Sequence, residues 1–581
     1  MQSASSGRRT VRFDTFELDV QAGELRRQGV RVRLQDQPLQ ILEMLLEHPG
    51  ELVTREKLRE QLWPSNSFVD FDHGLNRAIN KLREALGDSA ETPRYIETLA
   101  RRGYRFRGEL HREQEPIRAL LVMPLDNLSG DPDQEYFAAG LSEALTTSLA
   151  KIGALRVISR TTALICKRTQ KSLPELAREL GIDGVVEGSV LRSDGRVRIS
   201  AQLIHAPSDT HLWADSYDRD LRDILALQAE VATAIVNEIQ VKVTAQELRQ
   251  LAHAPVVDPE AYDAYLRGRA YWDKRSPAAI RTAIESFEQA IARDPNFAAA
   301  HAGLAGCMGS LGWWGYAPPD ASCAKAKALA SRALEMDTGL AEGHTALAWA
   351  VQYYDYDFVT AEREFRRAIA LDPHYPVAHH QLALTLALMG RFDESIAEAK
   401  HAVALDPTST VGSAALSYVA WLARRYDLLF ENASRNVELH PTFPASHWAL
   451  GTCYTDMARF DAAIAEMRLA VETSGGATIF SALLAETLAT AGHKDDARQM
   501  LEQLLKQSVR QYVSPYMVAR VHAALGESDV AFRWLETAYR ERAAWLATLK
   551  VDPHVDSLRS DPRFDDLLGR MNIPSATASQ P

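Results

Sequence analysis

The chain has 581 residues, of which 46% are hydrophobic and 24% charged, and its net charge is −12, so we expect three or more soluble globular domains. Its four cysteines are scattered, without a C-x-x-C pair or clustered histidines, which argues against a disulfide framework and a zinc site and fits a reducing cytosol. No apolar signal-peptide core opens the chain and no run of about 18 apolar residues occurs, so we expect a cytoplasmic protein without a membrane span.

The first sixty residues predict a small sheet followed by two helices. Residues 11–34 contain three short segments of alternating polarity with turn residues between them, which is typical of antiparallel strands. A helix is expected over 37–47, because its leucines fall on one face. Thr54 is placed to cap a second helix that ends near Leu62, and a loop is expected over 63–69.

The third predicted helix is amphipathic and has a basic outer face. Leu75, Ile79, Leu82 and Leu86 fall at i, i+4, i+7 and i+11, so they share one face. Asp72 is placed to cap its start and Gly87 to end it in a left-handed turn. Mostly outside the apolar stripe lie polar residues suited to contact a ligand or solvent: His73, Asn76, Arg77, Asn80, Lys81 and Arg83.

A basic hairpin is predicted after this helix. Residues 95–106 alternate in polarity on both sides of Arg101-Arg102-Gly103, which suits two strands with a basic tip. A helix with a basic, amide-bearing face followed by such a hairpin predicts a DNA reader, with the helix in the major groove and the hairpin on the backbone. The alternative is an amphipathic helix whose charged face is merely solvated.

The charge distribution favours DNA binding by this first module. Residues 1–112 carry 19 Lys and Arg against 17 Asp and Glu, a balance of +2, whereas the remainder carries 46 against 60, a balance of −14. Within 94–107, five arginines face Glu97 alone. A compact basic edge is sufficient for positioned phosphate contacts, while the acidic remainder should repel DNA.

The order sheet, three helices and hairpin resembles the α+β winged-helix domain of OmpR/PhoB-type response regulators over residues 11–108. The segments that carry the resemblance are GELVTREKLREQLW, LNRAINKLREALGD and RYIETLARRGYRF. The resemblance implies that the third helix reads bases and that the wing tip lies by the minor groove. By position, the residues it implies at double-stranded DNA are His73, Gly74, Arg77, Asn80, Lys81, Arg83, Thr98, Arg101 and Arg102.

Within this set, Arg77 suits guanine and Asn80 suits adenine, whereas Lys81 and Arg83 suit phosphates equally well. Thr98 is expected at the backbone. No phospho-acceptor receiver domain precedes the winged helix in this sequence, since ten residues lie ahead of it, so control by aspartyl phosphorylation is not expected. Family members commonly sit in tandem on direct repeats, so the resemblance also implies a homodimer on DNA.

A linker is expected over 109–116, followed by an α/β sandwich domain over 117–252, because strand and helix patterns alternate there. The segments NLSGDPDQEYFAAGL, ARELGIDGVVEGSV and HLWADSYDRDL resemble the TolB amino-terminal-type domain. The loop 126–133 follows the first strand, where α/β folds bind ligands. Its acidic residues do not match the calcium-loop spacing, and a solvated turn is the favoured interpretation over a metal site.

From residue 260 the chain is rich in Ala and Leu, and a period of 34 residues appears. Aspartates recur at one phase, each before an Ala-rich helical run, for which helix N-capping is a sufficient reason: Asp393, Asp427, Asp461, Asp495 and Asp529. This helix–turn–helix period resembles tetratricopeptide repeats, about eight of them over 260–545. A longer inter-helix turn is expected at 306–325, a polar capping helix over 546–572 and a disordered tail over 573–581.

Such an array forms an all-α solenoid whose concave face binds a protein or peptide partner. Five aromatic residues either line that face or fill the core between repeats: Trp313, Trp314, Tyr353, Tyr354 and Tyr356. The two interpretations are about equally supported, since aromatics adjacent in sequence cannot all face inward on a helix.

The sequence therefore predicts a cytoplasmic transcriptional regulator that binds promoter DNA through its winged helix and a partner, or itself, through the repeats. No catalytic residue, metal or cofactor is predicted, because the chain lacks G-x-S-x-G, H-E-x-x-H, Walker A and kinase or cyclase signatures. The alternative is a signalling scaffold whose winged helix docks protein and does not bind DNA.

Overall fold

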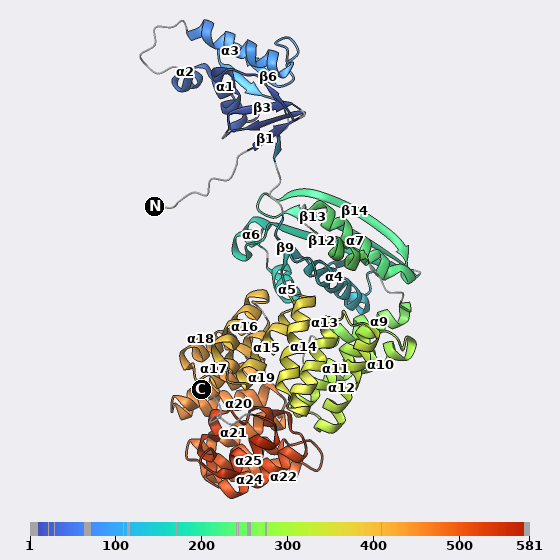
Figure 1. The fold of residues 1–581 in the computed structure, drawn as a ribbon, viewed down its shortest axis with the longest axis vertical. Helices are drawn as coiled ribbons and strands as arrows, with labels where there is room; N and C mark the ends of the chain where they lie inside the picture. Colours follow the sequence, from blue (N-terminus) through green and yellow to red (C-terminus); the bar gives the residue numbers. More distant parts are fainter. Residues whose placement is uncertain are drawn as a thin grey trace. The chain divides into compact units, whose positions relative to one another are not determined.

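The computed structural model describes residues 10–20, 22–27, 29–62, 71–108, 110–112, 117–169, 171–193, 195–239, 241, 243–252, 257–272, 276–407 and 409–573. The chain divides into two compact units, Met1–Pro116 and Ile117–Pro581, and each has its own hydrophobic core (Figure 1). The predicted loop at 63–69 and residues 574–581 of the predicted tail lie outside the described residues.

The first unit begins with a five-stranded antiparallel sheet in the order β4-β3-β2-β1-β8. Its strands are β1 (Thr10–Phe13), β2 (Phe16–Asp19), β3 (Glu24–Arg27), β4 (Val30–Val32) and β8 (Leu110–Arg112). The first of the three strand segments predicted within residues 11–34 is thus two strands, because Asp14 has a φ of 47° and the chain turns there. β8 occupies part of the expected linker, since it pairs with β1 and forms one edge of the sheet.

Within the described residues, three helices and a small second sheet complete the first unit. They are α1 (Asp36–Glu47), α2 (Arg55–Leu62), α3 (Phe71–Leu86) and the sheet β5-β7-β6, formed by β5 (Val53–Thr54), β7 (Gly103–Phe106) and β6 (Ile96–Leu99). Thr54 caps α2 as predicted, because its Oγ1 accepts from the Lys57 amide at 3.2 Å. Gly87 ends α3 with a φ of 65°. α3 starts at Phe71, so Asp72 lies inside its first turn and is not the cap.

The hairpin requires a glycine at position 103, where its second strand, β7, begins. At Gly103, whose φ is 153°, a Cβ atom would lie 2.1 Å from the Val53 carbonyl oxygen. β5 approaches β7 this closely because Val53 pairs with Tyr104 and Thr54 with Gly103. The core beneath the hairpin joins residues from both sheets and from α1 and α3, including Phe13, Leu42, Leu82 and Phe106.

The second unit begins with a mixed six-stranded sheet in the order β11-β9-β12-β13-β14, with β10 also paired to β12. The strands are β9 (Ala119–Val122), β10 (Asp126–Asn127), β11 (Arg156–Val157), β12 (Gly184–Ser193), β13 (Arg196–His205) and β14 (Thr210–Asp220). Alternate residues of β9 enter two different cores, Leu120 with α4 (Glu135–Ala150) and α7 (Ile224–Glu238), and Leu121 with α5 (Arg160–Arg168) and α6 (Leu173–Leu180). Helices therefore cover both faces. The sequence did not predict α5 or α8 (Ala245–Ala252).

This α/β part is fixed to the first helix of the following array. Asp263 of α9 (Pro259–Trp272) accepts a hydrogen bond from the Tyr136 hydroxyl at 2.8 Å and forms an ion pair with Arg192. Arg269 of the same helix pairs with Glu143 of α4. These contacts join residues of α4 and β12 to the start of the array, so the two parts form one compact unit.

Helices α9 to α24 in the described residues form eight antiparallel pairs that stack in sequence order (Figure 1). The connection 314–318 between the second pair's helices is longer than 389–391 in the fourth pair, as predicted. The further helices are α10 (Pro277–Arg293), α11 (Ala298–Trp313), α12 (Pro319–Met336), α13 (Ala341–Ala350), α14 (Phe358–Leu371), α15 (Pro376–Leu388), α16 (Phe392–Leu405), α17 (Thr410–Leu422), α18 (Tyr426–Leu439), α19 (Pro444–Asp456), α20 (Phe460–Thr473), α21 (Thr478–Thr490), α22 (Lys494–Gln507), α23 (Pro515–Leu525) and α24 (Ser528–Arg540), with a π-helical turn η3 (Val351–Asp355).

The periodic aspartates do not cap these helices. In α16, for example, the cap position is Arg391 and Asp393 is the second helical residue, without a side-chain capping bond. The same holds for Asp427, Asp461, Asp495 and Asp529. N-capping is therefore wrong as the reason for the repeat. A carboxylate in the first turn is still favourable, because it lies near the positive end of the helix dipole.

The segment after the last pair is two 3₁₀ helices, η4 (Ala544–Thr548) and η5 (Pro553–Leu558), followed by α25 (Pro562–Arg570). The single polar helix predicted over 546–572 is therefore wrong in its extent. Trp545 returns to α11, where its indole stacks on Trp313 at 4.5 Å and its Nε1 donates to the Trp313 carbonyl at 2.8 Å. The Tyr356 hydroxyl donates to the Ala543 carbonyl at 3.1 Å. The end of the solenoid thus closes against its second and third pairs.

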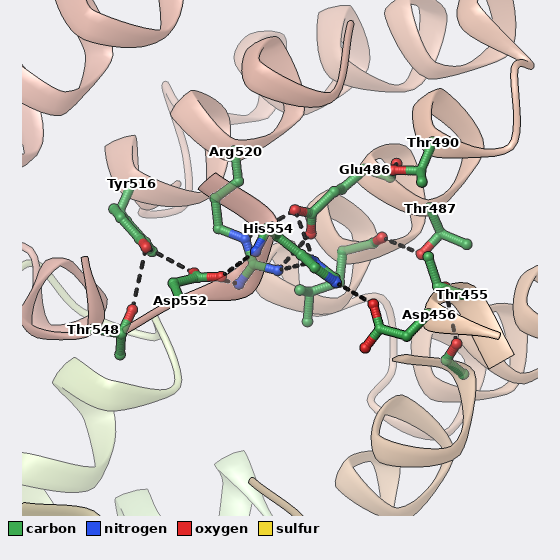
Figure 2. Close-up of polar contacts among 12 residues, drawn as sticks. Thr455, Asp456, Glu486, Thr487, Thr490, Tyr516, Arg520, Thr548, Asp552 and His554 are labelled. Atoms are coloured by element: carbon green, nitrogen blue, oxygen red, sulfur yellow. Dashed lines mark hydrogen bonds and ion pairs between the residues drawn. The ribbon is translucent and has the colours of Figure 1, made fainter. Parts of the chain in front are cut away.

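A buried polar cluster holds this segment to the repeats (Figure 2). Arg520 of α23 donates to both carboxylate oxygens of Glu486 of α21, at 3.0 and 2.7 Å, and lies 3.4 Å from Asp552. Asp552 accepts from the Tyr516 hydroxyl at 2.7 Å. His554 of η5 lies 3.1 Å from Glu486 and 3.5 Å from Asp456. Arg520, Glu486 and Asp552 are almost fully buried, so each charge is stabilised mainly by the opposite charge beside it.

We expect this cluster to make the C-terminal segment less stable as pH rises above neutrality. Burial lowers the pKa of His554, but Glu486 and Asp456 outweigh it and raise the pKa to about 10. A raised pKa means that the stabilisation is complete below the unfolded value near 6.5 and is lost as pH rises through the folded value. The free energy of opening residues 544–573 should fall by about 1–2 kcal/mol between roughly pH 6.5 and 8, measured by hydrogen exchange corrected for its intrinsic pH dependence. His554→Gln should remove this slope; an unchanged slope in the variant would contradict the assignment.

Candidate DNA-binding surface

α3 carries a polar face opposite a buried one. Leu75, Ile79, Leu82 and Leu86 are buried, with at most 2% of their surface exposed. On the other side His73, Arg77 and Asn80 are exposed, and no hydrogen bond or ion pair of Arg77 or Asn80 is found within the described residues. Gly74 in the first turn is half-buried. The predicted amphipathic pattern is confirmed, and it leaves Arg77 and Asn80 available for base edges.

Lys81 is half-buried at the rim of this face. Its Nζ donates to the side-chain oxygen of Gln35 at 2.6 Å, just before the start of α1. This hydrogen bond holds the ammonium group between α3 and α1. Such a position suits a point charge near a phosphate better than a hydrogen bond to a base.

Arg83 does not face the surface, which corrects its predicted contact with DNA. The residue is 6% exposed, and its guanidinium donates to the Ile96 carbonyl and to the Thr98 hydroxyl, both at 2.8 Å. It therefore joins α3 to strand β6 of the hairpin. Thr98 itself is exposed, but its hydroxyl already accepts from Arg83, so its position depends on that bond.

Asp88 also positions the hairpin, and sequence reasoning missed this. Its carboxylate accepts from the backbone amides of Arg94, Tyr95 and Ile96 at 2.7, 3.2 and 2.8 Å. These bonds anchor the start of β6 immediately after α3 ends. The available sequence signal was an aspartate directly after the terminating glycine, where a carboxylate commonly caps a turn.

The wing arginines divide into paired and unpaired groups. Arg105 pairs with Glu97 across the hairpin at 2.6 Å, and Arg94 pairs with Asp14 of the first sheet at 2.6 Å. Arg101 and Arg102 at the tip are exposed, and neither side chain has a hydrogen-bond or ion-pair partner in the described part of the chain. Arg101 has a φ of 62°, so its backbone is in the left-handed region that tight turns use. Two of the five arginines counted in the sequence are thus neutralised locally.

Arg55 links the reading helix to the wing, and sequence reasoning did not single it out. It donates to the Tyr104 hydroxyl at 3.1 Å and to the Asn76 side chain at 3.3 Å, while its backbone amide donates to the Arg102 carbonyl at 3.1 Å. Tyr104 also donates to Asn76 at 3.1 Å. α3 and the wing are therefore held in one geometry by a polar contact at their junction.

The acidic loop after β9 in the second unit is hydrogen-bonded to α5 and within itself. Lys167 donates to the Pro124 carbonyl at 2.7 Å and to Asp126 at 2.6 Å, and Asn127 donates to the Asp131 carbonyl at 2.8 Å. Among the described residues, no three His, Cys, Asp or Glu side chains converge as metal ligands. These bonds hold the loop against α5 and stabilise its turn.

The helical array encloses a cavity of about 570 Å³ along its inner face. Trp313, Trp314 and Tyr353 line this cavity, whereas Tyr356 is buried against the C-terminal segment and Tyr354 donates to Asp320 at 2.8 Å. Both interpretations of the five aromatics were therefore partly right. No helix within the described residues is both long and apolar enough to cross a lipid bilayer.

Two family models match the chain. Residues 29–106 match the transcriptional regulatory protein C-terminal family, and residues 377–409 match a tetratricopeptide repeat. These matches agree with the winged-helix-like first unit and the repeat-like helical array.

Three curated relatives are also similar. The Salmonella typhimurium transcriptional regulator HilA is 24% identical over 66% of this chain and 68% of its own length. A Rhizobium meliloti protein named "Putative adenylate cyclase 3" is 39% identical over 40% of each chain. The cholera toxin homolog transcriptional activator of Vibrio parahaemolyticus is 41% identical over 13% of this chain and 25% of its own. The alignment thus spans less than half of the cyclase-named relative and about two thirds of HilA.

Proposed function

We propose that this chain is a DNA-binding transcriptional regulator whose first unit reads promoter DNA. The observation that carries the proposal is the exposed pair Arg77 and Asn80 on α3, held beside the exposed tip Arg101 and Arg102 by the Arg55, Arg83 and Asp88 contacts. The family match over 29–106 and the regulator relatives support it. A helix face and a basic hairpin in a fixed arrangement suit the major groove and the adjacent backbone.

In this proposal each side chain has a separate role. Arg77 and Asn80 contact base edges, because a guanidinium matches guanine and an amide matches adenine. His73 and Gly74 lie at the same face near the start of α3. Lys81, Arg101, Arg102 and Thr98 contact phosphates, and Arg83 positions the wing from inside.

The second unit supplies the regulatory input in this proposal. Residues 117–252 act as a TolB amino-terminal-like module without catalytic function, supported by their three resembling segments. The repeat array over 260–545 binds a protein partner in the cytoplasm or associates with itself. A homodimer on DNA follows from the tandem arrangement expected of winged helices.

Binding of the full-length chain to random-sequence duplex DNA should depend strongly on salt. On the order of three to five phosphate contacts predict a slope of roughly −3 to −4.5 in a plot of log association constant against log salt. Replacing both Arg101 and Arg102 with alanine should reduce the steepness by about 2, since two phosphate contacts are lost. Fluorescence anisotropy over a salt series measures both slopes.

A matched control is Arg105→Ala, because Arg105 is a wing arginine already paired with Glu97. Its slope should stay near that of the unmodified chain. Salt-independent binding, or no binding to any member of a randomised duplex library, would contradict the regulator proposal. That outcome would favour the scaffold alternative, in which the winged helix docks protein.

A further inference from the structure

Asn76 is an exposed residue of α3 whose side-chain amide is held in one orientation. It lies one helical turn before Asn80 and one turn after His73, so it borders the polar face proposed to read DNA. Its Oδ1 accepts two hydrogen bonds, from the Tyr104 hydroxyl at 3.1 Å and from Arg55 Nη2 at 3.3 Å. These two bonds use both lone pairs of the amide oxygen, which leaves no acceptor for a ligand.

The donors around Asn76 determine which end of its amide faces outward. Arginine has N–H donors and no acceptor, so the atom that faces the Arg55 guanidinium must be the amide oxygen. Arg55 Nη1 also donates to the Tyr104 oxygen at 3.1 Å, which leaves the Tyr104 O–H to donate to Asn76. Reversing the amide would place its N–H groups against these donors. The Nδ2 group therefore points away from Arg55 and Tyr104, and it has no hydrogen-bond partner within the described residues.

The two donors are themselves fixed by the hairpin and by the start of α2. Tyr104 is 2% exposed and lies in β7, where it pairs with Val53 of β5. Arg55 is the first residue of α2, and its backbone amide donates to the Arg102 carbonyl at 3.1 Å. Its guanidinium carbon lies 5.8 Å from the centre of the Tyr104 ring. The folded elements therefore set the orientation of the Asn76 amide before any ligand binds.

This orientation gives Asn76 a different base preference from Asn80. Asn80 is exposed and its amide has no hydrogen-bond partner within the described residues, so it offers both the donor and the acceptor that adenine requires at N7 and N6. Asn76 offers only N–H donors. In the major groove guanine presents two acceptors, N7 and O6, thymine presents O4, and cytosine presents the N4–H₂ donor. A side chain that only donates therefore favours guanine and opposes cytosine.

We propose that Asn76 is a specificity-determining residue that reads guanine, because Arg55 and Tyr104 make its amide a donor-only group. Its N–H₂ group donates to the N7 and O6 edge of the base. Arg55 and Tyr104 are positioning residues that act through Asn76. This inference rests on the proposed function, since it requires α3 to lie in the major groove of duplex DNA.

The test uses the full-length chain and a library of duplexes with a randomised centre, from which preferred sites are selected and sequenced. Asn76→Asp keeps the shape of the side chain and still accepts from Arg55 and Tyr104, but it presents a carboxylate oxygen in place of N–H₂. We expect one base position to change from guanine to cytosine, because cytosine N4–H₂ donates to a carboxylate. On single-base variants of the selected site, the ratio of guanine to cytosine affinity at that position should fall by at least about tenfold.

Asn80→Asp is the matched control, because it makes the same chemical change and adds the same charge one turn further along α3. Its effect should fall at a different base position. Tyr104→Phe tests the positioning role, since it removes a hydroxyl from a buried ring and keeps the ring. The Asn76 amide can then turn and accept from adenine N6–H₂, so the preference for guanine over adenine should fall by at least about threefold at the Asn76 position. Affinity for random-sequence duplex should stay the same.

The outcomes separate this inference from the proposed function. An unmodified chain that binds no duplex would contradict both. A chain that selects sites, but whose base profile Asn76→Asp leaves unchanged or whose affinity it lowers equally for all four bases, would overturn the reading role of Asn76 alone. Loss of an adenine preference in Asn76→Asp would overturn the donor-only assignment. An unchanged base profile in Tyr104→Phe would overturn the positioning role of Tyr104.

Discussion

Replacing Arg520 with methionine should lower the free energy of opening of the C-terminal segment by about 3–5 kcal/mol, the largest effect expected of any single substitution in the repeat array. Methionine fills much of the same volume, so the loss does not come from a cavity. It comes from Glu486 and Asp552, which are 5% and 0% exposed at their side chains and would lose the buried cation that pairs with them. A buried carboxylate without a partner is strongly unfavourable.

The charge state of Glu486 supports this reasoning. Burial raises the pKa of its carboxyl, but Arg520 and His554 outweigh burial and lower the pKa to about 2. Arg520 and His554 therefore stabilise the ionised form of Glu486 in spite of its burial. Removing Arg520 leaves His554 as its nearest remaining cation, so the double variant with Glu486→Gln should recover part of the loss.

Hydrogen exchange of peptides covering residues 515–573 measures the effect locally, which avoids assuming two-state unfolding for a chain of this size. Arg498→Met is the matched control, because Arg498 pairs with Glu527 at 2.9 Å on the surface and is 51% exposed. It should cost less than about 1 kcal/mol. Equal effects of the two substitutions would show that burial of the cluster is not what makes Arg520 important.

Arg77→Ala should weaken binding to the best DNA site by about 1–3 kcal/mol and relax the base preference there. The reason is its position, since Arg77 is exposed on the outer face of α3 and its side chain forms no hydrogen bond or ion pair with the described residues. Selection from a randomised duplex library with the full-length protein, followed by affinities on the selected and scrambled sites, measures both quantities.

Two arginines serve as comparisons for Arg77. Arg102→Ala should weaken selected and scrambled sites alike, because a wing-tip contact to phosphate carries no base information. Arg83→Ala should instead loosen the hairpin, because Arg83 is buried and bonds to Ile96 and Thr98. Identical specificity changes in Arg77→Ala and Arg102→Ala would contradict the division between base and backbone contacts.

Several features of this protein follow from local sequence patterns alone. The apolar stripe of α3 and the alternation of the hairpin residues predicted both elements, because each pattern has the period of its own secondary structure. The 34-residue recurrence predicted the helix pairs for the same reason. The exposure of Arg77 and Asn80 also followed, since residues opposite a buried stripe must face outward on a helix.

Other features were decided only by tertiary structure. Arg83 lies near the edge of the stripe, and whether it reached solvent depended on where β6 packed. Asp88 and Arg55 became positioning residues because they meet strands that the sequence alone did not place beside them. The N-capping role assigned to Asp393 and its counterparts failed because the N-cap position lies two residues before the recurring aspartate.

The contact between Trp313 and Trp545 was the least predictable feature. Trp313 and Trp545 are 232 positions apart, and no periodic signal relates them. Local patterns specify which face of a helix is buried, because burial follows a short period along the chain. They do not specify which distant segment covers that face, because this depends on the accumulated curvature of eight helix pairs and on the buried charges that hold the last segment in place.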